Sequence, residues 1–195
     1  ETVKMVEDLM NPISLMDGDS LPVSAFMGNP DGQFEHGAAA YEKRGTAVTV
    51  PTWNAEKCIQ CNQCAFVCSH ATIRPFMLSE DEVKAAPSNI KVADTKPKAS
   101  EYKYTMSVSP LDCMGCGECI TVCPVGAIEM VPQESQADEQ PVFDYLVANV
   151  SKKPGMPADN TVKGSQFNQP LLEFSGSCAG CAETSYARLI TQLFG

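Results

Sequence analysis

The sequence is poor in basic residues, in aromatic residues and in long hydrophobic runs, and each shortage excludes a class of protein. Lys and Arg number 14 against 24 Asp and Glu in 195 residues, so the formal net charge is −10. Nucleic acids and anionic membrane surfaces both require a basic face, and neither is an expected partner. No apolar run approaches the roughly 20 residues of a membrane-spanning helix. Aromatic residues make up 7% of the chain, so we expect a modest core.

A secretory leader is also missing from the start of the sequence. We therefore expect a cytoplasmic protein, in which thiols stay reduced and a disulfide scaffold is disfavoured. Ten cysteines are nevertheless present. Their spacing must then be interpreted in terms of metal binding.

Eight of the cysteines fall in two copies of one pattern, C-x₂-C-x₂-C-x₃-C. The first copy runs from Cys58 to Cys68 and the second from Cys113 to Cys123, at a constant offset of 55 residues. The similarity continues past the last cysteine of each copy. This duplication predicts two similar half-domains around a pseudo-twofold axis.

Each half is expected to contain a strand, a cysteine loop, a short helix and a second strand. The first strands are expected at residues 47–50, where Pro51 ends the strand, and at 104–108. The second strands are expected at 73–77 and 128–131. The predicted fold class is therefore α+β, with a long insertion between the halves.

Outside the two motifs the chain is expected to form flanking segments. Residues 1–46 are predicted to be an extended N-terminal arm or linker, in which Asn11-Pro12 ends a short helix. Residues 47–135 form the cysteine-containing domain, with a polar surface insertion at 79–103. Residues 136–195 are a linker and the start of a further domain. That segment ends in an apolar helix face with nothing to bury it, so we expect a truncated chain.

The duplicated spacing is that of bacterial ferredoxins, in which each run holds a [4Fe–4S] cluster and the fourth cysteine ligates the other cluster. The spacing therefore predicts a ferredoxin-like domain with two [4Fe–4S] clusters. Structural zinc sites instead combine two separated cysteine pairs, which these runs do not resemble. The first predicted ligand set is Cys58, Cys61, Cys64 and Cys123. The second predicted set is Cys113, Cys116, Cys119 and Cys68.

The sequence allows more than one role for two further features. Cys178 and Cys181 form a separate C-x₂-C pair, which suits a redox dithiol, half of a zinc site or, in a truncated chain, half of a third cluster. His70 follows the first motif directly and could tune a cluster or carry a proton. A packing or surface role is the favoured interpretation of His70.

Several segments together resemble the pyruvate:ferredoxin (flavodoxin) oxidoreductases, which are large thiamine-diphosphate enzymes. The similarity runs over nearly the whole chain, and a simple ferredoxin has neither the arm nor the tail. The sequence departs from the family at Ser69, where Pro is usual, and at Ala182 and Ser185. The segments that carry the resemblance are Leu21–Phe26, Tyr41–Gly45, Cys58–Cys64, Ile73–Phe76 and Ser175–Gly195.

The resemblance implies that the chain is an internal segment of a longer polypeptide. Alone it is not expected to be catalytic, because the substrate site lies elsewhere. Cys178 and Cys181 would be two of four ligands of a third [4Fe–4S] cluster, and Glu183 would contact thiamine diphosphate, which binds with Mg²⁺. The complete enzyme, expected to be a homodimer, would oxidatively decarboxylate pyruvate with coenzyme A to acetyl-CoA and CO₂. Single electrons would pass through the clusters to ferredoxin or flavodoxin.

Two other functions compete with this interpretation. A free-standing ferredoxin-type carrier would need neither the C-x₂-C pair nor the apolar terminal helix. A structural zinc module would lack the visible absorbance of iron–sulfur clusters.

Overall fold

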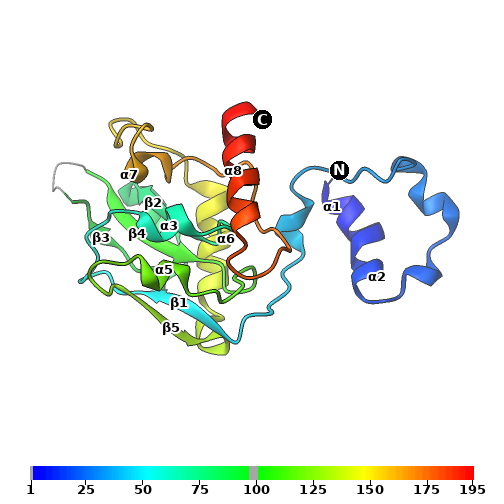
Figure 1. Ribbon diagram of the computed structural model, residues 1–195, viewed down its shortest axis with the longest axis horizontal. Coiled ribbons are helices and arrows are strands. Elements are labelled where there is room, and N and C mark those ends of the chain that lie inside the picture. Colours follow the sequence, from blue (N-terminus) through cyan, green and yellow to red (C-terminus); the bar gives the residue numbers. More distant parts are fainter. Residues whose placement is uncertain (1, 97–100) are drawn as a thin grey trace. The chain divides into compact units, whose positions relative to one another are not determined.

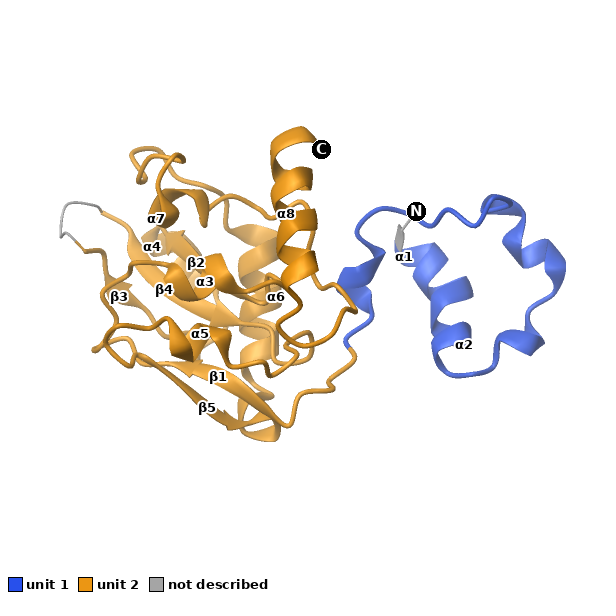
Figure 2. Cartoon of the chain, viewed as in Figure 1, with its two compact units in different colours: residues 1–43 blue, residues 44–195 orange. Residues whose placement is uncertain are grey.

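The computed structural model describes residues 2–96 and 101–195. The chain divides into two compact units, one ending at Lys43 and the other beginning at Arg44 (Figure 2). Each unit has its own buried apolar residues, and the second contains all ten cysteines.

The first unit consists of a helical segment followed by single 3₁₀ turns. α1 (Thr2–Met5), a π-helical stretch (Val6–Met10) and α2 (Asn11–Ser14) follow one another directly. The prediction that Asn11-Pro12 ends the helix is therefore wrong. Pro12 lies in the first turn of α2, a position where proline is tolerated because its missing N–H is least needed. The 3₁₀ turns span Gly18–Ser20, Val23–Gly28 and Ala38–Tyr41. The unit buries Met5, Val6, Leu9 and Ala38 against one another.

Two antiparallel sheets form the framework of the second unit (Figure 1). β1 (Thr49–Trp53) pairs with β5 (Ile128–Pro132). β2 (Ile73–Leu78) pairs with β4 (Lys103–Val108), which also pairs with the short β3 (Ala93–Asp94). Each main pair joins one strand from the first cysteine repeat to one strand from the second. The mixture of helices and sheets agrees with the predicted α+β class.

Pro51 lies inside β1 rather than at its end, so the predicted limit of that strand is wrong. Pro51 stands opposite Met130 in the register of β1 with β5. The sheet has only these two strands, and proline is tolerated where a strand has a free edge. Pro75 occupies the same kind of position in β2, opposite Met106, and β2 is also an edge strand.

The two halves share backbone contacts at the 55-residue offset. Trp53 stands opposite Ile128 in one sheet, and Ile73 stands opposite Val108 in the other. The N–H of Asn54 donates to the Ala127 carbonyl at 2.9 Å, and its counterpart, from Ser109 to Thr72, measures 2.8 Å. Residues of one half therefore complete the hydrogen bonding of the other.

The helices of the second unit are mostly short. α3 (Gln63–Val67) and α5 (Glu118–Thr121) each contain the third cysteine of a motif, and α6 (Glu139–Asn149) packs against β4. α4 lies in the predicted insertion, of which residues 97–100 fall outside the described part of the chain. Ser79 and Glu82 form a capping box at its start, a signal that the sequence analysis missed. The bounds are α3 (Gln63–Val67), α4 (Glu80–Ala85), α5 (Glu118–Thr121), α6 (Glu139–Asn149), α7 (Val162–Ser165) and α8 (Ala182–Phe194).

The main core lies among the sheets and the cysteine loops. Tyr104 is fully buried and makes edge contacts with Trp53 and Phe167, at centroid distances of 5.8 and 6.4 Å. Four thiol-bearing residues are part of this same core, namely Cys58, Cys64, Cys68 and Cys119. The cysteine loops are thus held by the core rather than attached to its outside.

Three backbone positions in each half have a positive φ, a conformation that favours glycine. The second half uses glycine at all three, whereas the first half uses larger residues. The matched pairs are Gln60 with Gly115, Asn62 with Gly117, and Ala71 with Gly126.

Two of these glycines give a test of the cysteine-loop backbone. An added Cβ at Gly115 would lie 3.0 Å from the Thr49 carbonyl oxygen and 3.2 Å from the Ala47 Cβ, whereas at Gly126 it would meet nothing within 4 Å. We expect Gly115→Ala to lower the free energy of unfolding by about 2–4 kcal/mol, because left-handed strain and overpacking act together. Gly126→Ala carries only the strain and should lower it by about 1 kcal/mol. Denaturant midpoints measured without oxygen check this, and equal losses would contradict it.

Candidate metal centres

The first cavity of interest is lined by thiols from both halves of the repeat. Three belong to the first cysteine loop, and the fourth is Cys123 from the end of the second. The other lining residues are mostly apolar and include Ile59, Met106, Val125 and Ile128. The four thiols are Cys58, Cys61, Cys64 and Cys123.

The second cavity repeats this arrangement with the halves exchanged. Three thiols belong to the second cysteine loop, and the fourth is Cys68 from the first. Pro51, His70, Thr72 and Met130 contribute to its wall. The four thiols are Cys113, Cys116, Cys119 and Cys68.

Two short helices explain why the sets cross. α3 ends at Val67, directly before Cys68, and α5 ends at Thr121, two residues before Cys123. The two helices contact each other, so each carries its last thiol toward the other half. The structure thus brings together both thiol sets that the spacing predicts. That they ligate iron remains a prediction.

Backbone N–H groups in both cysteine loops donate to sulfur. The N–H of Gln60 lies 3.3 Å from Cys58 Sγ, and that of Gly115 lies 3.4 Å from Cys113 Sγ. The N–H of Thr72 lies 3.4 Å from Cys68 Sγ; its counterpart at Ala127 lies 3.2 Å from Cys123 Sγ. Such donors stabilise negative charge on sulfur. Both cavities therefore contain equivalent backbone N–H donors that can stabilise thiolates.

Side chains anchor the first cysteine loop where glycine is absent. Gln60 is 1% exposed; its amide nitrogen donates to the Asp94 carbonyl at 2.7 Å, and its amide oxygen accepts from the Lys96 N–H at 2.7 Å. Asn62 accepts from the Tyr104 hydroxyl at 2.7 Å and donates to the Lys163 carbonyl at 2.8 Å. These bonds offset the backbone strain of a positive φ.

Burial holds several of the thiols in their protonated form. Desolvation raises the pKa of Cys64 to about 12 and that of Cys113 to about 11, and it also raises the pKa of Cys119. Neighbouring thiols act in the same direction. Metal ions bind thiolates, so filling these cavities must release protons.

The arrangement suits an iron–sulfur cluster better than a single ion. A zinc ion at about 2.3 Å from each sulfur needs its ligands to converge on one point. Among residues 2–96 and 101–195, no three Cys, His, Asp or Glu side chains are arranged to hold one metal ion. Four thiols around a space, with backbone donors directed at sulfur, match the Cys₄ chemistry of a cluster.

Cys178 and Cys181 lie beside the second cavity rather than within it. An added Cβ at Gly180, between them, would lie 3.2 Å from the Cys116 Cβ. Cys181 directly precedes α8, and hydrogen bonds from the Thr184 backbone and hydroxyl and the Glu183 backbone lower the pKa of its thiol. In the described residues no further cysteine joins this pair around a common ion. Glu183 is exposed in the first turn of α8.

His70 belongs to the wall of the second cavity and is 2% exposed. Its Nδ1 lies 3.0 Å from the Ser175 hydroxyl and 3.1 Å from the Ser175 carbonyl. Its Nε2 is buried without a hydrogen-bond partner among the described residues. Sequence reasoning favoured a packing or surface role, and only its position two residues after Cys68 could have indicated more.

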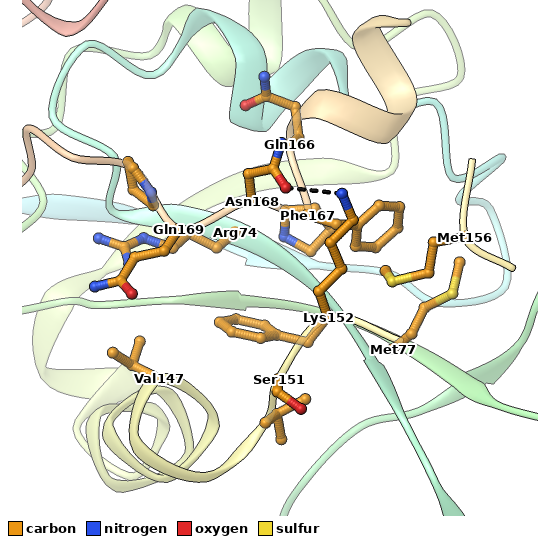
Figure 3. Close-up of a pocket in the computed structure, with 14 residues that line it drawn as sticks. Arg74, Met77, Val147, Ser151, Lys152, Met156, Gln166, Phe167, Asn168 and Gln169 are labelled. Atoms are coloured by element: carbon orange, nitrogen blue, oxygen red, sulfur yellow. Dashed lines mark hydrogen bonds between the residues drawn. The ribbon is translucent and has the colours of Figure 1, made fainter. Parts of the chain in front are cut away.

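A roomier cavity contains no thiol (Figure 3). Its basic side chains are compensated, since Arg74 pairs with Glu173 and Lys152 pairs with Asp159. Lys152 also donates to Asn168 Oδ1 at 2.9 Å, across the upper part of Figure 3. This cavity is separate from the thiol-lined sites in its residues and its chemistry.

Comparison with known proteins places these sites in a family. Residues 57–127 match a model described as a 4Fe-4S dicluster domain, and residues 1–47 match a domain of unknown function called EKR. Pyruvate-flavodoxin oxidoreductase of Klebsiella pneumoniae is 52% identical over 97% of this chain. Pyruvate:ferredoxin oxidoreductase of Moorella thermoacetica is 48% identical over the whole chain. Pyruvate dehydrogenase [NADP(+)] of Cryptosporidium parvum is 46% identical over 98% of it.

The chain is homologous to a segment of the pyruvate-flavodoxin and pyruvate:ferredoxin oxidoreductases. It spans 16% of the Klebsiella relative and 17% of the Moorella relative. The family resemblance noted from sequence motifs is thereby confirmed, and the dicluster match covers all eight thiols that line the two cavities. In the part of the chain that the structure describes, no helix has the length and apolarity to cross a bilayer.

The anchoring role of Gln60 can be tested against a neighbouring glutamine, Gln63. We expect Gln60→Ala to lower the free energy of unfolding by about 1–2 kcal/mol, because the buried Gln60 amide no longer bonds to two partly buried backbone groups. Gln63 is exposed, and Gln63→Ala should change it by less than about 0.5 kcal/mol. Unfolding monitored by circular dichroism without oxygen measures both. Equal effects of the two substitutions would refute the anchoring role.

Proposed function

We propose that this chain is the electron-transfer segment of a pyruvate oxidoreductase. The observation that carries the proposal is the presence of two cavities, each lined by four thiols drawn from both halves of a repeat. The homology to pyruvate oxidoreductases and the dicluster match support it. On this proposal the two halves are related by a pseudo-twofold axis, and the matched registers at the 55-residue offset support that relation.

The complete protein would oxidatively decarboxylate pyruvate with coenzyme A to acetyl-CoA and CO₂. Thiamine diphosphate, bound with Mg²⁺, would supply the electron sink for that chemistry. This chain would contribute Glu183 toward the thiamine site, and Cys178 and Cys181 toward a third [4Fe–4S] cluster. The eight thiols of the two cavities would hold two further [4Fe–4S] clusters.

Packing of the C-x₂-C loop suggests the order in which the sites are used. Gly180 lies against Cys116, so the Cys178–Cys181 loop is next to the second cavity. The contact between α3 and α5 then links the second cavity to the first. Electrons would enter at the C-x₂-C pair, pass the second cavity and leave from the first.

The rim of the first cavity has the character of an exit site. Ile59 and Val125 line it and are 46% and 39% exposed. Exposed apolar residues around a buried centre suit a transient redox partner, here ferredoxin or flavodoxin. Relatives named for flavodoxin, ferredoxin and NADP⁺ share this segment, so we place the choice of acceptor outside the features common to them.

α8 supports the view that this segment works within a larger protein. The helix is 13 residues long, and one apolar set of side chains is 58–83% exposed. Covering that set requires a partner surface, which we assign to the rest of the parent polypeptide, in a homodimeric enzyme. The exposed set is Tyr186, Leu189, Ile190, Leu193 and Phe194.

Crossed ligation predicts a specific pattern of iron content. The chain reconstituted without oxygen should hold about eight iron and eight sulfide, from two Cys₄ clusters. Cys58→Ala with Cys123→Ala removes two thiols from one cavity, so about four iron should remain. Cys58→Ala with Cys68→Ala removes one thiol from each cavity, so iron should fall toward zero.

The opposite ranking of these two double variants would show that each loop ligates its own cluster. Zinc in place of iron in the reconstituted chain, without visible absorbance, would refute the electron-transfer proposal itself.

The C-x₂-C pair can be tested separately in the complete protein. We expect Cys178→Ala with Cys181→Ala to lower its iron content by about four atoms, because one cluster loses half of its ligands. Iron and sulfide analysis measures the loss. The wild-type protein prepared in parallel is the control, and an unchanged iron content would contradict a third cluster at this pair.

A further inference from the structure

The walls of the two cavities differ at matched positions of the repeat. His70 in the wall of the second cavity corresponds to Val125 in the wall of the first, at the 55-residue offset. Thr72 corresponds in the same way to Ala127. Polar side chains thus face one thiol set where apolar side chains face the other, although the backbone donors are equivalent.

The His70 ring is held by Ser175 through one nitrogen, and its other nitrogen has no hydrogen-bond partner among the described residues. It is 2% exposed, its Nδ1 contacts Ser175, and its Nε2 is buried with no partner among the described residues. A buried polar atom without a partner is unfavourable and calls for a ligand. The only acceptors that the proposed function adds to this wall are the sulfurs of the group held in the cavity.

Ser175 determines which ring nitrogen carries the proton. Its hydroxyl can donate to Nδ1 at 3.0 Å, which leaves the proton of the neutral ring on Nε2. Its carbonyl, at 3.1 Å, would instead accept from a protonated Nδ1 and leave Nε2 as an acceptor. A sulfur acceptor in the second cavity, whose wall includes His70, would favour the first arrangement.

We propose that His70 Nε2–H donates a hydrogen bond to sulfur of the group held in the second cavity and raises its reduction potential. The inference rests on the proposed function, because it requires an iron–sulfur cluster at these thiols. A donor to sulfur stabilises the reduced cluster, which carries one more negative charge, so reduction becomes easier. Val125, at the matched position in the wall of the first cavity, has no side-chain donor.

Thr72 and Arg188 both contact Cys68, one of the thiols of the second cavity. The Thr72 hydroxyl lies 3.5 Å from Cys68 Sγ, and the Arg188 guanidinium donates to the Cys68 carbonyl. Glu118, which also lines the second cavity, is exposed to solvent and its charge is screened. These groups stay unchanged when His70 alone is replaced, so that substitution isolates the imidazole.

The test compares two replacements of similar shape in the complete protein, purified without oxygen. His70→Gln keeps an N–H donor near the position of Nε2, and His70→Met lacks one. Potentiometric titration followed by electron paramagnetic resonance gives the potential of each cluster. We expect His70→Met to lower the reduced-to-oxidised ratio of one cluster about tenfold at a fixed potential, or about 59 mV for one electron. His70→Gln should restore most of that loss.

A spectroscopic readout separates a hydrogen bond from a packing effect. Electron–nuclear double resonance in H₂O and D₂O should detect an exchangeable proton coupled to that cluster in the wild type and in His70→Gln. The signal should be absent in His70→Met. Val125→Met, at the matched position, is the control and should leave both this signal and the affected potential unchanged.

Ser175→Ala provides a second variant if His70→Met loses iron. It retains the ring but removes the hydroxyl donor, so Nδ1 carries the proton and donates to the Ser175 carbonyl, and Nε2 has no proton to donate. The potential should fall in the same direction, with loss of the exchangeable-proton signal. Fully loaded variants with unchanged potentials would overturn this inference alone. A wild-type protein without iron would overturn the proposed function together with it.

Discussion

Neither half of the cysteine repeat can complete a four-thiol cavity alone, and the rest of the structure depends on this crossing. Cys68 reaches the second cavity only because α3 and α5 pack together, and Cys123 reaches the first for the same reason. Each main strand pair also joins the two halves, because β1 pairs with β5 and β2 pairs with β4. Strand pairing and thiol placement therefore enforce one another, and a half-domain would lack both its strand partners and its fourth thiols.

Segments added outside the repeat make the two cavities unequal. On the side of the first cavity, Gln60 bonds to the segment around Asp94, and Asn62 bonds to Lys163. On the side of the second, Ser175 contacts His70, and Arg188 reaches the Cys68 carbonyl. The C-terminal segment contacts the end of the first repeat at Cys68 and His70 and the glycine-containing loop at Cys116, while the loop without glycine is held by hydrogen bonds to the insertion and α7. Similar cysteine loops acquire different surroundings in this way.

Sequence reasoning succeeded where the physical requirement is local and periodic. The cysteine spacing predicted which thiols line each cavity. Three thiols within seven residues lie on one loop around one part of a site, so the fourth thiol must come from the other half. Strands at 73–77 and 104–108 were predicted from apolar and β-branched residues, and β2 and β4 confirm them. Sequence reasoning failed at Pro12 and Pro51, where the environment of the residue, rather than its type, decides whether proline interrupts an element.

Contacts between distant segments could not be predicted from the sequence. His70 and Ser175 are 105 residues apart, and nothing in either local sequence indicates that they meet. The same holds for Gln60 and the insertion, because nothing in that polar segment indicates that the backbone of Asp94 and Lys96 bonds to Gln60. Long-range hydrogen bonds of this kind carry no local periodicity.

Thiols that serve two purposes link metal binding to folding in this protein. Cys58, Cys64, Cys68 and Cys119 are core residues as well as members of the cavity walls. Burial raises the pKa of Cys64 and Cys119, so these groups are neutral and act as small apolar side chains until metal displaces their protons. With 7% aromatic residues the chain has little other apolar material to fill the interior. On the proposed function, the free energy of metal binding is then part of the free energy of folding. The low aromatic content and the high cysteine content are related, because the same thiols fill the interior and line the cavities.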